Sequence, residues 1–479
     1  MFRRIANWFE DRTGIAASLG PLIKHPVPAD TDWWYALGSS TLVAFVILVA
    51  TGIALATGYT PDPSSAYRSI DWRTNSASFG HQLRAVHYFA ASAMVILVGM
   101  HALHVFVSGS FKYPREVNWL VGVALLFLTL LMAFTGQLLR WDQNAVWTVY
   151  VGAEQAGRTP FVGGWLAQLI MGGTNVGGAT LTRFYASHVF FVPALIFSMV
   201  GFHLFLVIRN GVSERPKSGR PVDPKTYKKW YQDLLRREGV PFWPDAAWKD
   251  VLVAVGVVAA IVAVGVVAAI VAVGVVAAIA ALALIIGPPE LGKPPDPTNL
   301  NAAPEPDWYF LRYFAALAVI PYNTQNLIII GGPLLLVVLM ITLPFFAGKG
   351  ERSPKRRPWA VGMAGAILLL IGSLLYASKH PSWAPNFEAK PLPASLVGAS
   401  SGPVWQGAQL FNQQSCEYCH LIGSYGGVYG PNLTHIASRY TTGNMIIRIL
   451  GGAYNMPAYT SILKPAQVSD LVAFLSTRR

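Results

Sequence analysis

The sequence predicts an all-α protein, in which a polytopic membrane bundle of about seven transmembrane helices precedes a small helical domain. Only 12% of its 479 residues are charged and 53% are hydrophobic, whereas soluble domains carry about 25% charged residues. Apolar runs long enough to cross a bilayer need about 20 residues, and the chain contains seven of them. A polar C-terminal segment follows the last run, which predicts a separate domain there.

The seven apolar runs are separated by polar loops. They cover Trp33–Ala56, His81–Val107, Val117–Leu139, Phe184–Ile208, Val251–Ile286, Asn326–Phe346 and Trp359–Ala377. We divide the chain accordingly into a surface segment (1–32), a four-helix domain (33–210), a basic loop (211–245), a three-helix domain (246–377), a linker (378–403) and a terminal domain (404–479).

The N-terminal segment predicts an amphipathic helix on the membrane surface. Met1–Lys24 contains arginines but no continuous apolar core, so we do not expect a cleavable signal peptide. Its apolar residues recur at helical spacing, which is typical of a helix that lies in the interface plane.

Basic residues predict the orientation of the bundle. The net charge of +13 collects in short loops, at Lys112–Arg115, Arg209–Arg237 and Lys349–Arg357, rather than on a face suited to nucleic acid. With seven spans, these loops fall on one side, which the positive-inside rule makes cytoplasmic. The terminal domain is then expected on the outer side of a bacterial cytoplasmic membrane.

The fifth apolar run contains a perfect repeat. The nine residues VAVGVVAAI occur at 253–261, 262–270 and 271–279. A helix of about 36 residues would be about 54 Å long, against a hydrocarbon core of about 30 Å. We expect a local sequence expansion whose helix tilts, protrudes or breaks.

Four histidines lie inside the second and fourth runs. His87 and His101 are 14 residues apart, and His188 and His203 are 15 apart. These spacings place each pair on nearly one helix face, about 21–22 Å apart along the axis. Because the two runs are antiparallel, His87 meets His188 near the outer surface and His101 meets His203 near the inner one. Ionisable residues inside a membrane are energetically costly and mark functional sites. Two bis-histidine b-type heme sites would account for these four histidines.

Glycines on the first and third runs repeat the histidine spacing. Gly38 and Gly52 are 14 residues apart, as are Gly122 and Gly136. A single glycine in a membrane helix is explained by helix packing. The matched set predicts slots in which a flat heme approaches the backbone.

Three further polar residues are candidates for pairing with heme propionates. Arg84 and Arg183 are expected near the outer site, and His104 lies one turn beyond His101. Charge-assisted pairing with carboxylates suits these side chains. An interfacial side chain that reaches toward water is the alternative for each of them.

The terminal domain contains the motif Cys416-Glu417-Tyr418-Cys419-His420, and these are the two cysteines of the chain. Such a motif is typical of covalent c-type heme attachment, with His420 as an axial ligand. A CxxC redox or zinc site is the alternative. Because this attachment takes place outside the cytoplasmic membrane, the motif agrees with the orientation predicted from loop charge.

The second axial ligand of this heme is expected to be Met456, which precedes a proline. A methionine ligand raises the reduction potential. His435 and Met445 compete for this role, although Met445 fits better as a core residue of a helix.

Residues 30–377 resemble the cytochrome b family of the quinol–cytochrome c and quinol–plastocyanin oxidoreductases. The resemblance depends on the segments RAVHYFAASAMVILVGMH, TGQLLRWDQ, TLTRFYASH and PDWYF. The 15-residue histidine spacing and the 4 + 3 layout are similar to the chloroplast (bf) type, and the terminal domain resembles class I cytochromes c. The sequence departs from the family at Ala36, where bf-type proteins have a heme-tethering cysteine, and at Arg140, where the family has proline.

The segment Pro306-Asp307-Trp308-Tyr309 is expected in an outer loop. Its residues alone favour an interfacial aromatic belt with Asp307 in a turn. The resemblance implies instead a quinol-oxidising site, since the family has Pro-Glu-Trp-Tyr there and a carboxylate can accept a quinol proton. The stretch Trp141–Gln143 is expected to form another wall of this site.

The resemblance implies a catalytic subunit of a quinol–cytochrome c reductase. Quinol would be oxidised at the outer face, coupled to proton translocation. One electron would pass through two b hemes, and the other through a Rieske iron–sulfur partner to the c heme. Further implied partners are a soluble cytochrome c or a terminal oxidase, membrane lipid and a second copy of the chain in a homodimer. The alternatives are a diheme membrane anchor or an electron conduit of another respiratory complex.

Overall fold

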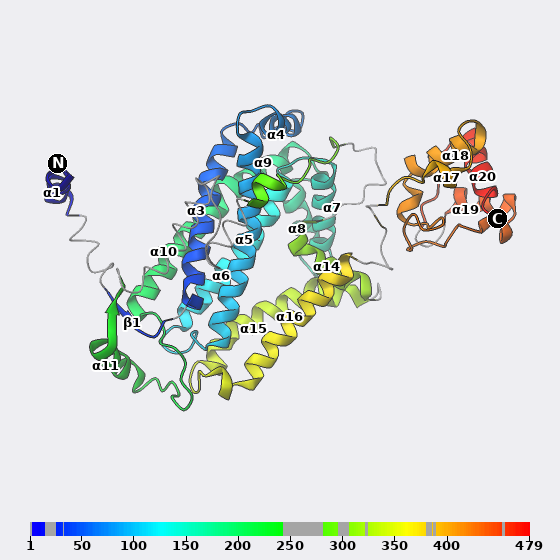
Figure 1. Ribbon diagram of the computed structural model, residues 1–479. Helices are drawn as coiled ribbons and strands as arrows, with labels where there is room; N and C mark the ends of the chain where they lie inside the picture. Colours follow the sequence, from blue (N-terminus) through cyan, green and yellow to red (C-terminus); the bar gives the residue numbers. More distant parts are fainter. Residues whose placement is uncertain are drawn as a thin grey trace. The chain divides into compact units, whose positions relative to one another are not determined.

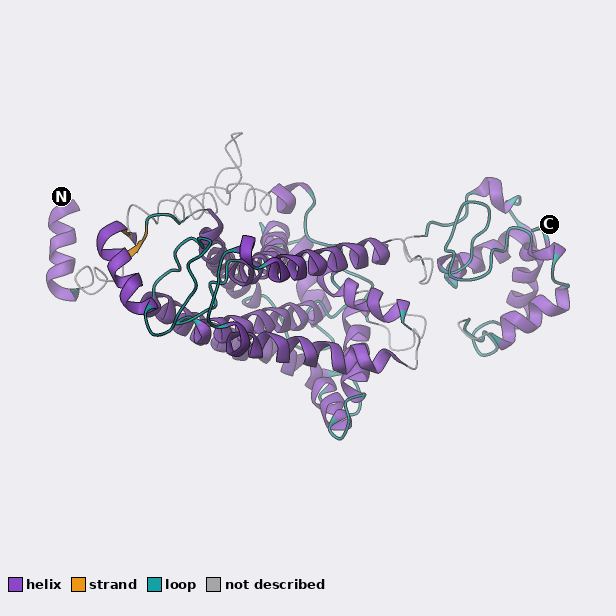
Figure 2. Ribbon diagram, turned by 90° about the horizontal axis from the view of Figure 1, so that it is seen from below, coloured by secondary structure: helices purple, strands orange, loops and turns teal. Residues whose placement is uncertain are grey.

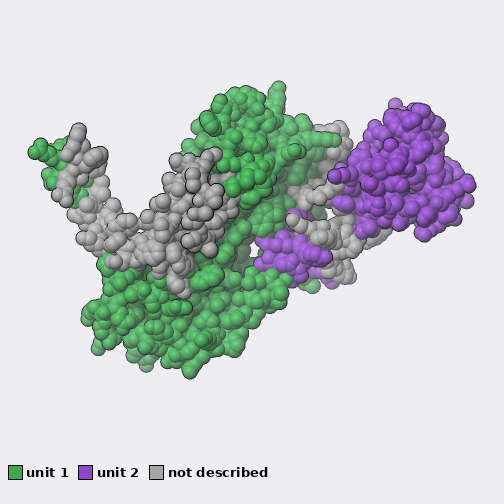
Figure 3. All heavy atoms as spheres, in the orientation of Figure 1, with its two compact units in different colours: residues 1–309, 326–369 green, residues 310–325, 370–479 purple. Residues whose placement is uncertain are grey.

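The computed structural model describes residues 2–14, 25–31, 33–242, 281–295, 306–320, 324–379, 386, 389–452 and 456–479. The chain divides into two compact units, coloured separately in Figure 3: residues 1–309 with 326–369, and residues 310–325 with 370–479. Helices make up nearly all regular structure in the described residues (Figure 2), and two short strands, β1 (Pro26–Pro28) and β2 (Gly239–Pro241), pair antiparallel. The predicted all-α class is confirmed.

Six helices in the described residues are long and apolar enough to cross a membrane. They are Trp34–Ala56, Gly80–Val107, Glu116–Leu138, Gly178–Asn210, Leu327–Ala347 and Pro358–Ala377. Each matches an apolar run of the sequence to within a few residues, apart from Gly178–Asn210, which begins six residues before the expected start. Most of the expected fifth run, including the repeat at 253–279, lies outside the described residues.

Four spans of the first unit form a bundle (Figure 1). They are α3 (Leu37–Ala56), which follows the 3-10 turn η1 (Trp33–Ala36), α5 (Gly80–Val107), α6 (Glu116–Leu138), and a continuous helix of α9 (Gly178–Ala186), η2 (Ser187–Phe191) and α10 (Val192–Asn210). Helix α3 packs against α5, and α6 packs against α10. Buried apolar side chains, including Phe45, Met94 and Ile196, join these helices.

Shorter helices complete the first unit. They are α1 (Phe2–Thr13), α4 (Ala66–Asn75), α7 (Gln143–Gly157), α8 (Gly163–Met171), α11 (Tyr227–Glu238) and the start of α14 (Trp308–Val319). Two more spans belong to it in whole or in part: α15 (Gly332–Ala347), preceded by η5 (Leu327–Gly331), and α16 (Pro358–Lys379), preceded by η6 (Pro354–Arg356). Within the N-terminal segment, Phe2–Thr13 is helical, as its spacing predicts.

A π-helical turn explains the unequal histidine spacings. The turn η2 (Ser187–Phe191) contains His188. A π-bulge accommodates one extra residue without rotating the rest of the helix. The 15 residues from His188 to His203 therefore span the same rotation about the helix axis as the 14 from His87 to His101.

Basic side chains at one end of the bundle bind the C-terminal carbonyls of three helices. Arg357 donates to the carbonyls of Phe106 and Val107 in α5. Arg115 donates to the carbonyls at the end of α10, including Gly211. Lys112 donates to carbonyls at the end of α15. Cations are favourable at the negative ends of helices. The loops 108–115, 211–226 and 348–357 meet at this end of the bundle, which we call the basic end.

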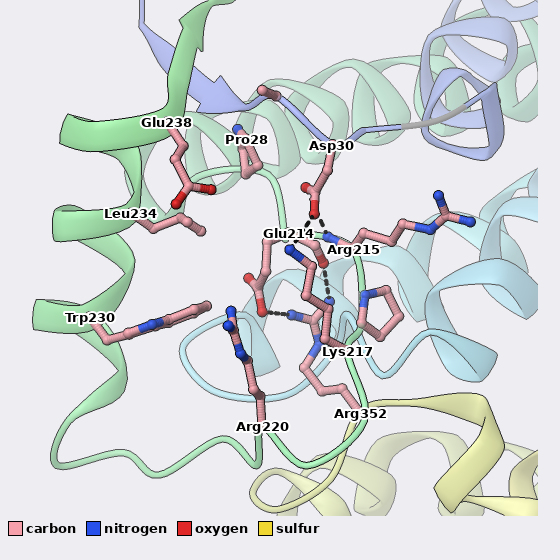
Figure 4. A pocket seen from close by; sticks show the side chains of 12 residues that line it. Pro28, Asp30, Glu214, Arg215, Lys217, Arg220, Trp230, Leu234, Glu238 and Arg352 are labelled. Carbon is pink, nitrogen blue, oxygen red and sulfur yellow. Dashed lines mark hydrogen bonds and ion pairs between the residues drawn. The ribbon is translucent and has the colours of Figure 1, made fainter.

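A buried ion pair also holds the basic end together. Glu214 pairs with Arg352, whose side chain is 2% exposed, and it accepts a hydrogen bond from Tyr227 at 2.7 Å. Figure 4 shows this pair at the wall of a pocket, where Lys217 lies 3.5 Å from Asp30. These contacts join the 211–226 loop to the 348–357 loop and to the N-terminal segment.

The second unit contains a compact helical domain after residue 389. Its elements are α17 (Ala394–Val397), α18 (Gly402–Gln413), η7 (Cys416–Tyr418), η8 (Ile436–Ser438), α19 (Thr442–Gly451) and α20 (Pro465–Ser476). Helix α18 packs against α20, where the Phe411 and Phe474 rings lie 5.8 Å apart. Met445 is buried in the same core.

Replacing Arg352 with methionine should lower the free energy of unfolding by about 3 kcal/mol, because it leaves the Glu214 carboxylate buried without its partner. Thermal denaturation of the purified protein in detergent measures this as a lower Tm. The control Arg356→Met removes a 62% exposed side chain 3.9 Å from Glu351, and it should change stability by less than about 0.5 kcal/mol. Equal Tm values for the two variants would contradict this account.

Candidate functional site

The four histidines of the bundle face one another in two pairs. The His87 and His188 rings have centroids 6.4 Å apart, and the His101 and His203 rings have centroids 6.5 Å apart. The second pair lies toward the basic end, where α5 and α10 finish. We call His87 and His188 the outer pair and His101 and His203 the inner pair.

These separations fit a metal bound between two imidazoles. A metal–imidazole nitrogen bond is about 2.0–2.1 Å long, and the ring centre lies about 1.1 Å beyond that nitrogen, so trans ligands have centroids about 6.3 Å apart. Both pairs come within about 0.2 Å of this value. The residues therefore fit heme iron at two depths, as the sequence spacing indicates.

Each of the four matched glycines lies against one of these histidines. A Cβ atom on Gly136 would lie 2.6 Å from the His188 ring, and one on Gly52 would lie 3.3 Å from His87. A Cβ atom on Gly38 would lie 3.4 Å from the His101 ring, and one on Gly122 would lie 3.6 Å from the His203 ring. Their spacing predicts slots for heme, and the structure shows that the glycines also make room for the imidazole rings.

Two threonines that the sequence reasoning missed orient the outer pair. Thr51 Oγ1 lies 2.8 Å from His87 Nδ1, and Thr135 Oγ1 lies 3.1 Å from His188 Nδ1. Each threonine directly precedes a glycine that touches the same ring. The dipeptide Thr-Gly, present on the first and third runs, was the signal that could have revealed them.

The three candidate propionate partners have protein contacts of their own. Arg84 is buried and donates to the Pro289 carbonyl at 2.8 Å. Arg183 is exposed and donates to the Leu169 carbonyl at 3.2 Å. His104 lies edge-on to Tyr35, with ring centroids 5.3 Å apart.

The Pro306–Tyr309 segment lies against the bundle near the outer pair. Trp308 Nε1 donates to Ser92 Oγ of α5 at 3.2 Å. The Asp307 amide lies 3.5 Å from Gln137 Oε1 of α6, and Gln137 directly follows Gly136. Tyr309 is buried, and its hydroxyl donates to Asp307 Oδ2 at 2.6 Å. The Asp307 carboxylate is therefore held in a segment that contacts α5 five residues after His87 and α6 one residue after Gly136.

The Trp141–Gln143 stretch has a structural role next to this segment. Asp142 is 1% exposed and caps α7, where it accepts from the Ala145 amide at 2.8 Å. Its other oxygen accepts from the Gly292 amide at 3.1 Å. Trp141 is buried with a positive φ of 50°. This stretch thereby ties α7 to residues 292–293.

The Cys-Glu-Tyr-Cys-His motif forms η7 and the residues after it. The two thiols are unpaired, and His420 Nδ1 donates to the Pro431 carbonyl at 2.8 Å. Burial lowers the pKa of His420, which keeps the imidazole neutral, with Nε2 free to bind a metal. A Cβ atom on Gly430 would lie 2.7 Å from this ring. A larger residue at position 430 would therefore displace the His420 ring.

The alternative chemistries fit this motif less well. Burial raises the pKa of the Cys416 thiol to about 12, whereas redox-active CxxC thiols have lowered pKa values. Among the described residues, no group of three or more His, Cys, Asp and Glu side chains gathers to hold a bare metal ion. Two thiols followed by a neutral histidine suit thioether attachment of heme.

The candidates for the second axial ligand differ in their surroundings. Met445 is 5% exposed and belongs to the helical core, while Met456 is half-buried at the edge of the same core. His435 is exposed, and its Nδ1 bonds the Arg479 carbonyl at 2.8 Å. Met456 therefore remains our prediction for this ligand.

Three family models match successive parts of the chain. Cytochrome b (N-terminal)/b6/petB matches residues 92–280, cytochrome b (C-terminal)/b6/petD matches residues 294–392, and cytochrome c oxidase, cbb3-type, subunit III matches residues 403–475. The order is that of the bundle, the later spans and the terminal domain.

Known proteins resemble this chain over part or most of its length. Cytochrome b6 of Heliobacterium mobile is 40% identical over 210 residues, which cover 43% of this chain and 99% of the relative. The menaquinol:cytochrome c reductase cytochrome b subunit of Bacillus subtilis is 35% identical over 221 residues, 44% of this chain and 99% of the relative. A solved structure, a hyperthermophilic respiratory Complex III, shares the fold with a TM-score of 0.63 at 24% identity, covering 78% of this chain and 91% of that one.

Replacing the glycines with alanine should reduce b-heme binding in the order of their contacts. Gly136→Ala places a methyl group 2.6 Å from the His188 ring, closer than packed carbon atoms at about 3.5–4.0 Å, so we expect loss of one b heme. Gly122→Ala, at 3.6 Å, should retain both hemes. The absorbance of the pyridine hemochrome measures the b-heme content of each purified variant.

The matched control is Gly362→Ala in α16, where a Cβ atom meets nothing within 4 Å. Full b-heme content in Gly136→Ala, or equal losses in Gly136→Ala and Gly362→Ala, would contradict the assignment of this glycine.

Proposed function

The chain belongs to the cytochrome b/b6 family, and from this premise we propose that it is the quinol-oxidising cytochrome subunit of a bc-type complex, with a c-type cytochrome fused to its C-terminus. The observation that carries the proposal is the placement of Asp307 beside the outer histidine pair. A proton acceptor and an electron acceptor are both needed where quinol is oxidised, because the reaction releases two protons and two electrons.

The histidine pairs would hold two b hemes, and the terminal motif would hold one c heme. His87 and His188 would ligate the outer b heme, and His101 and His203 the inner one. Cys416 and Cys419 would attach the c heme, and His420 would bind its iron. When bound, these hemes would supply one-electron carriers at two depths of the bilayer and in the terminal domain.

Asp307 is the proposed acceptor of a quinol proton. Its carboxylate is half-buried and already accepts a hydrogen bond from the Tyr309 hydroxyl at 2.6 Å, which holds it in one orientation. Rotation of this short side chain away from Tyr309 would release the proton toward water. Trp308, which donates to Ser92, and the buried Pro306 would fix the backbone on either side of Asp307.

Gln137 is a proposed contact for the quinol itself. Its Nε2 group is buried and has no hydrogen-bond partner among the described residues, although buried polar groups are nearly always bonded. Its Oε1 faces the Asp307 amide. A quinol oxygen near Asp307 would give this amide group an acceptor.

The second electron requires a partner subunit. Both cysteines of the chain lie in the CxxCH motif, and iron–sulfur clusters are held by cysteine or histidine ligands. We therefore propose a Rieske iron–sulfur protein that receives this electron and passes it toward the c heme. A soluble cytochrome c or a terminal oxidase would be the next acceptor, and a homodimer in membrane lipid would be the assembled form.

The proposed orientation follows from charge. The basic end holds the loops 108–115, 211–226 and 348–357, so the positive-inside rule places it on the cytoplasmic side. Asp307 and the outer pair would then face the outside, where quinol protons are released and where c-type heme is attached. Quinol oxidation at this face would contribute to proton translocation.

Replacing Asp307 with asparagine should slow quinol oxidation about 10²-fold, since the amide cannot accept the proton and positioned acid–base groups typically contribute 10²–10⁴-fold. Turnover of the assembled complex is measured with a quinol and an oxidised soluble cytochrome c. The reduced-minus-oxidised spectrum should not change.

Asp71→Asn is the control for this experiment, because Asp71 is a half-buried acid in α4 whose carboxylate accepts a hydrogen bond from Asn75 at 2.8 Å. It should turn over like the unmodified protein. A normal rate for Asp307→Asn would remove Asp307 from the mechanism.

A further inference from the structure

We propose that Thr51 and Thr135 are positioning residues that hold the reduction potential of the outer b heme below the value it would have without them. Both contact the outer histidine pair, and among the described residues no hydroxyl bonds Nδ1 of either histidine of the inner pair. This inference rests on the proposed function, because it requires hemes bound between the facing histidines.

The direction of the two hydrogen bonds follows from the partners of each hydroxyl. Thr51 Oγ1 is 2.7 Å from the Ile47 carbonyl, and Thr135 Oγ1 is 2.9 Å from the Leu131 carbonyl. A carbonyl can only accept, so each threonine proton is directed to the backbone of its own helix. The hydroxyl oxygen then accepts from the histidine Nδ1–H. This fixes the tautomer in which Nε2 is free for iron.

The inner pair lacks this arrangement. The residues before Gly38 and Gly122 are Leu37 and Val121, which have no hydroxyl group. Nδ1 of His101 and of His203 has no hydrogen-bond partner of good geometry among the described residues. The Asn118 carbonyl lies near the His203 ring, but its geometry falls short of a full hydrogen bond.

The effect on potential follows from ligand basicity. A hydrogen bond donated by the second ring nitrogen makes the imidazole a more basic ligand. A more basic ligand stabilises the higher charge of ferric iron over ferrous iron, so the potential falls. Two such bonds at the outer pair would make that heme the weaker electron acceptor and favour onward transfer to the inner heme.

The two threonines are not equivalent. The Met132 carbonyl, which lies on the same helix as Thr135, is also near the His188 ring. Loss of the Thr135 hydroxyl therefore leaves His188 with another acceptor. Loss of the Thr51 hydroxyl leaves His87 with no other side-chain acceptor among the hydrogen bonds of the described residues. Thr51 should have the larger effect.

The test is a potentiometric titration of both b hemes in the purified full-length chain. In Thr51→Val, we expect the ferrous-to-ferric ratio of the outer heme at a fixed potential to rise several-fold, where tenfold corresponds to 59 mV. The inner heme should not shift. Thr135→Val should shift the same heme less. The absorbance lost in His87→Leu identifies the outer heme.

Matched controls separate this effect from a general loss of packing. Thr41→Val in α3 and Thr129→Val in α6 remove hydroxyls that bond only the carbonyl four residues back, at 2.8 Å in each case. Neither should move a potential. Thr51→Ser retains an acceptor and should keep the unmodified value.

Unchanged outer potentials in both valine variants, equal shifts of both hemes, or a shift in Thr51→Ser as large as in Thr51→Val would overturn the proposal. Loss of the outer heme in Thr51→Val with its retention in Thr51→Ser would support the positioning role, and its loss in both would count against it. Failure of the proposed function is distinguishable. Without the proposed heme sites the unmodified protein would contain no b heme, and without the proposed quinol chemistry it would contain both b hemes and show the potential shifts but would not turn over quinol.

Discussion

The distance between facing imidazole rings is the constraint on which the bundle depends. Rings 6.4 and 6.5 Å apart must lie on separate antiparallel helices, at two heights, with matching rotation. The π-helical turn at Ser187–Phe191 restores that rotation in the fourth span, and four glycines allow α3 and α6 to approach the rings. Helix packing, histidine spacing and glycine placement therefore serve one geometry, at both the outer and the inner pair.

The two ends of this geometry are stabilised by different chemistry. At the basic end, buried cations bind the carbonyl ends of three helices, and the Glu214–Arg352 pair joins loops that are distant in sequence. At the outer end, the Arg84 side chain donates to the Pro289 carbonyl and the Asp142 carboxylate accepts from the Gly292 amide, which holds residues 289–292. The basic residues from which we predict the orientation thus also close the bundle at the basic end.

Helical periodicity made much of this predictable. The spans and the face-to-face arrangement of His87 with His188 follow from 3.6 residues per turn and antiparallel order. Periodicity does not predict contacts that depend on single rotamers, such as the Thr51 and Thr135 hydrogen bonds and the helix cap by Asp142. It also does not predict the local change of backbone hydrogen bonding in the π-turn. Arg84 shows the same limit, because its position near the outer pair was predictable but its bond to Pro289 was not.

The central claim is that two histidine pairs and one CxxCH motif hold three hemes in this chain. The most direct measurement is a reduced-minus-oxidised spectrum with heme quantitation on the purified protein. The account predicts two b hemes extracted by acidic acetone and one c heme that stays attached to the polypeptide. Absence of b heme from a folded, membrane-inserted protein would contradict it.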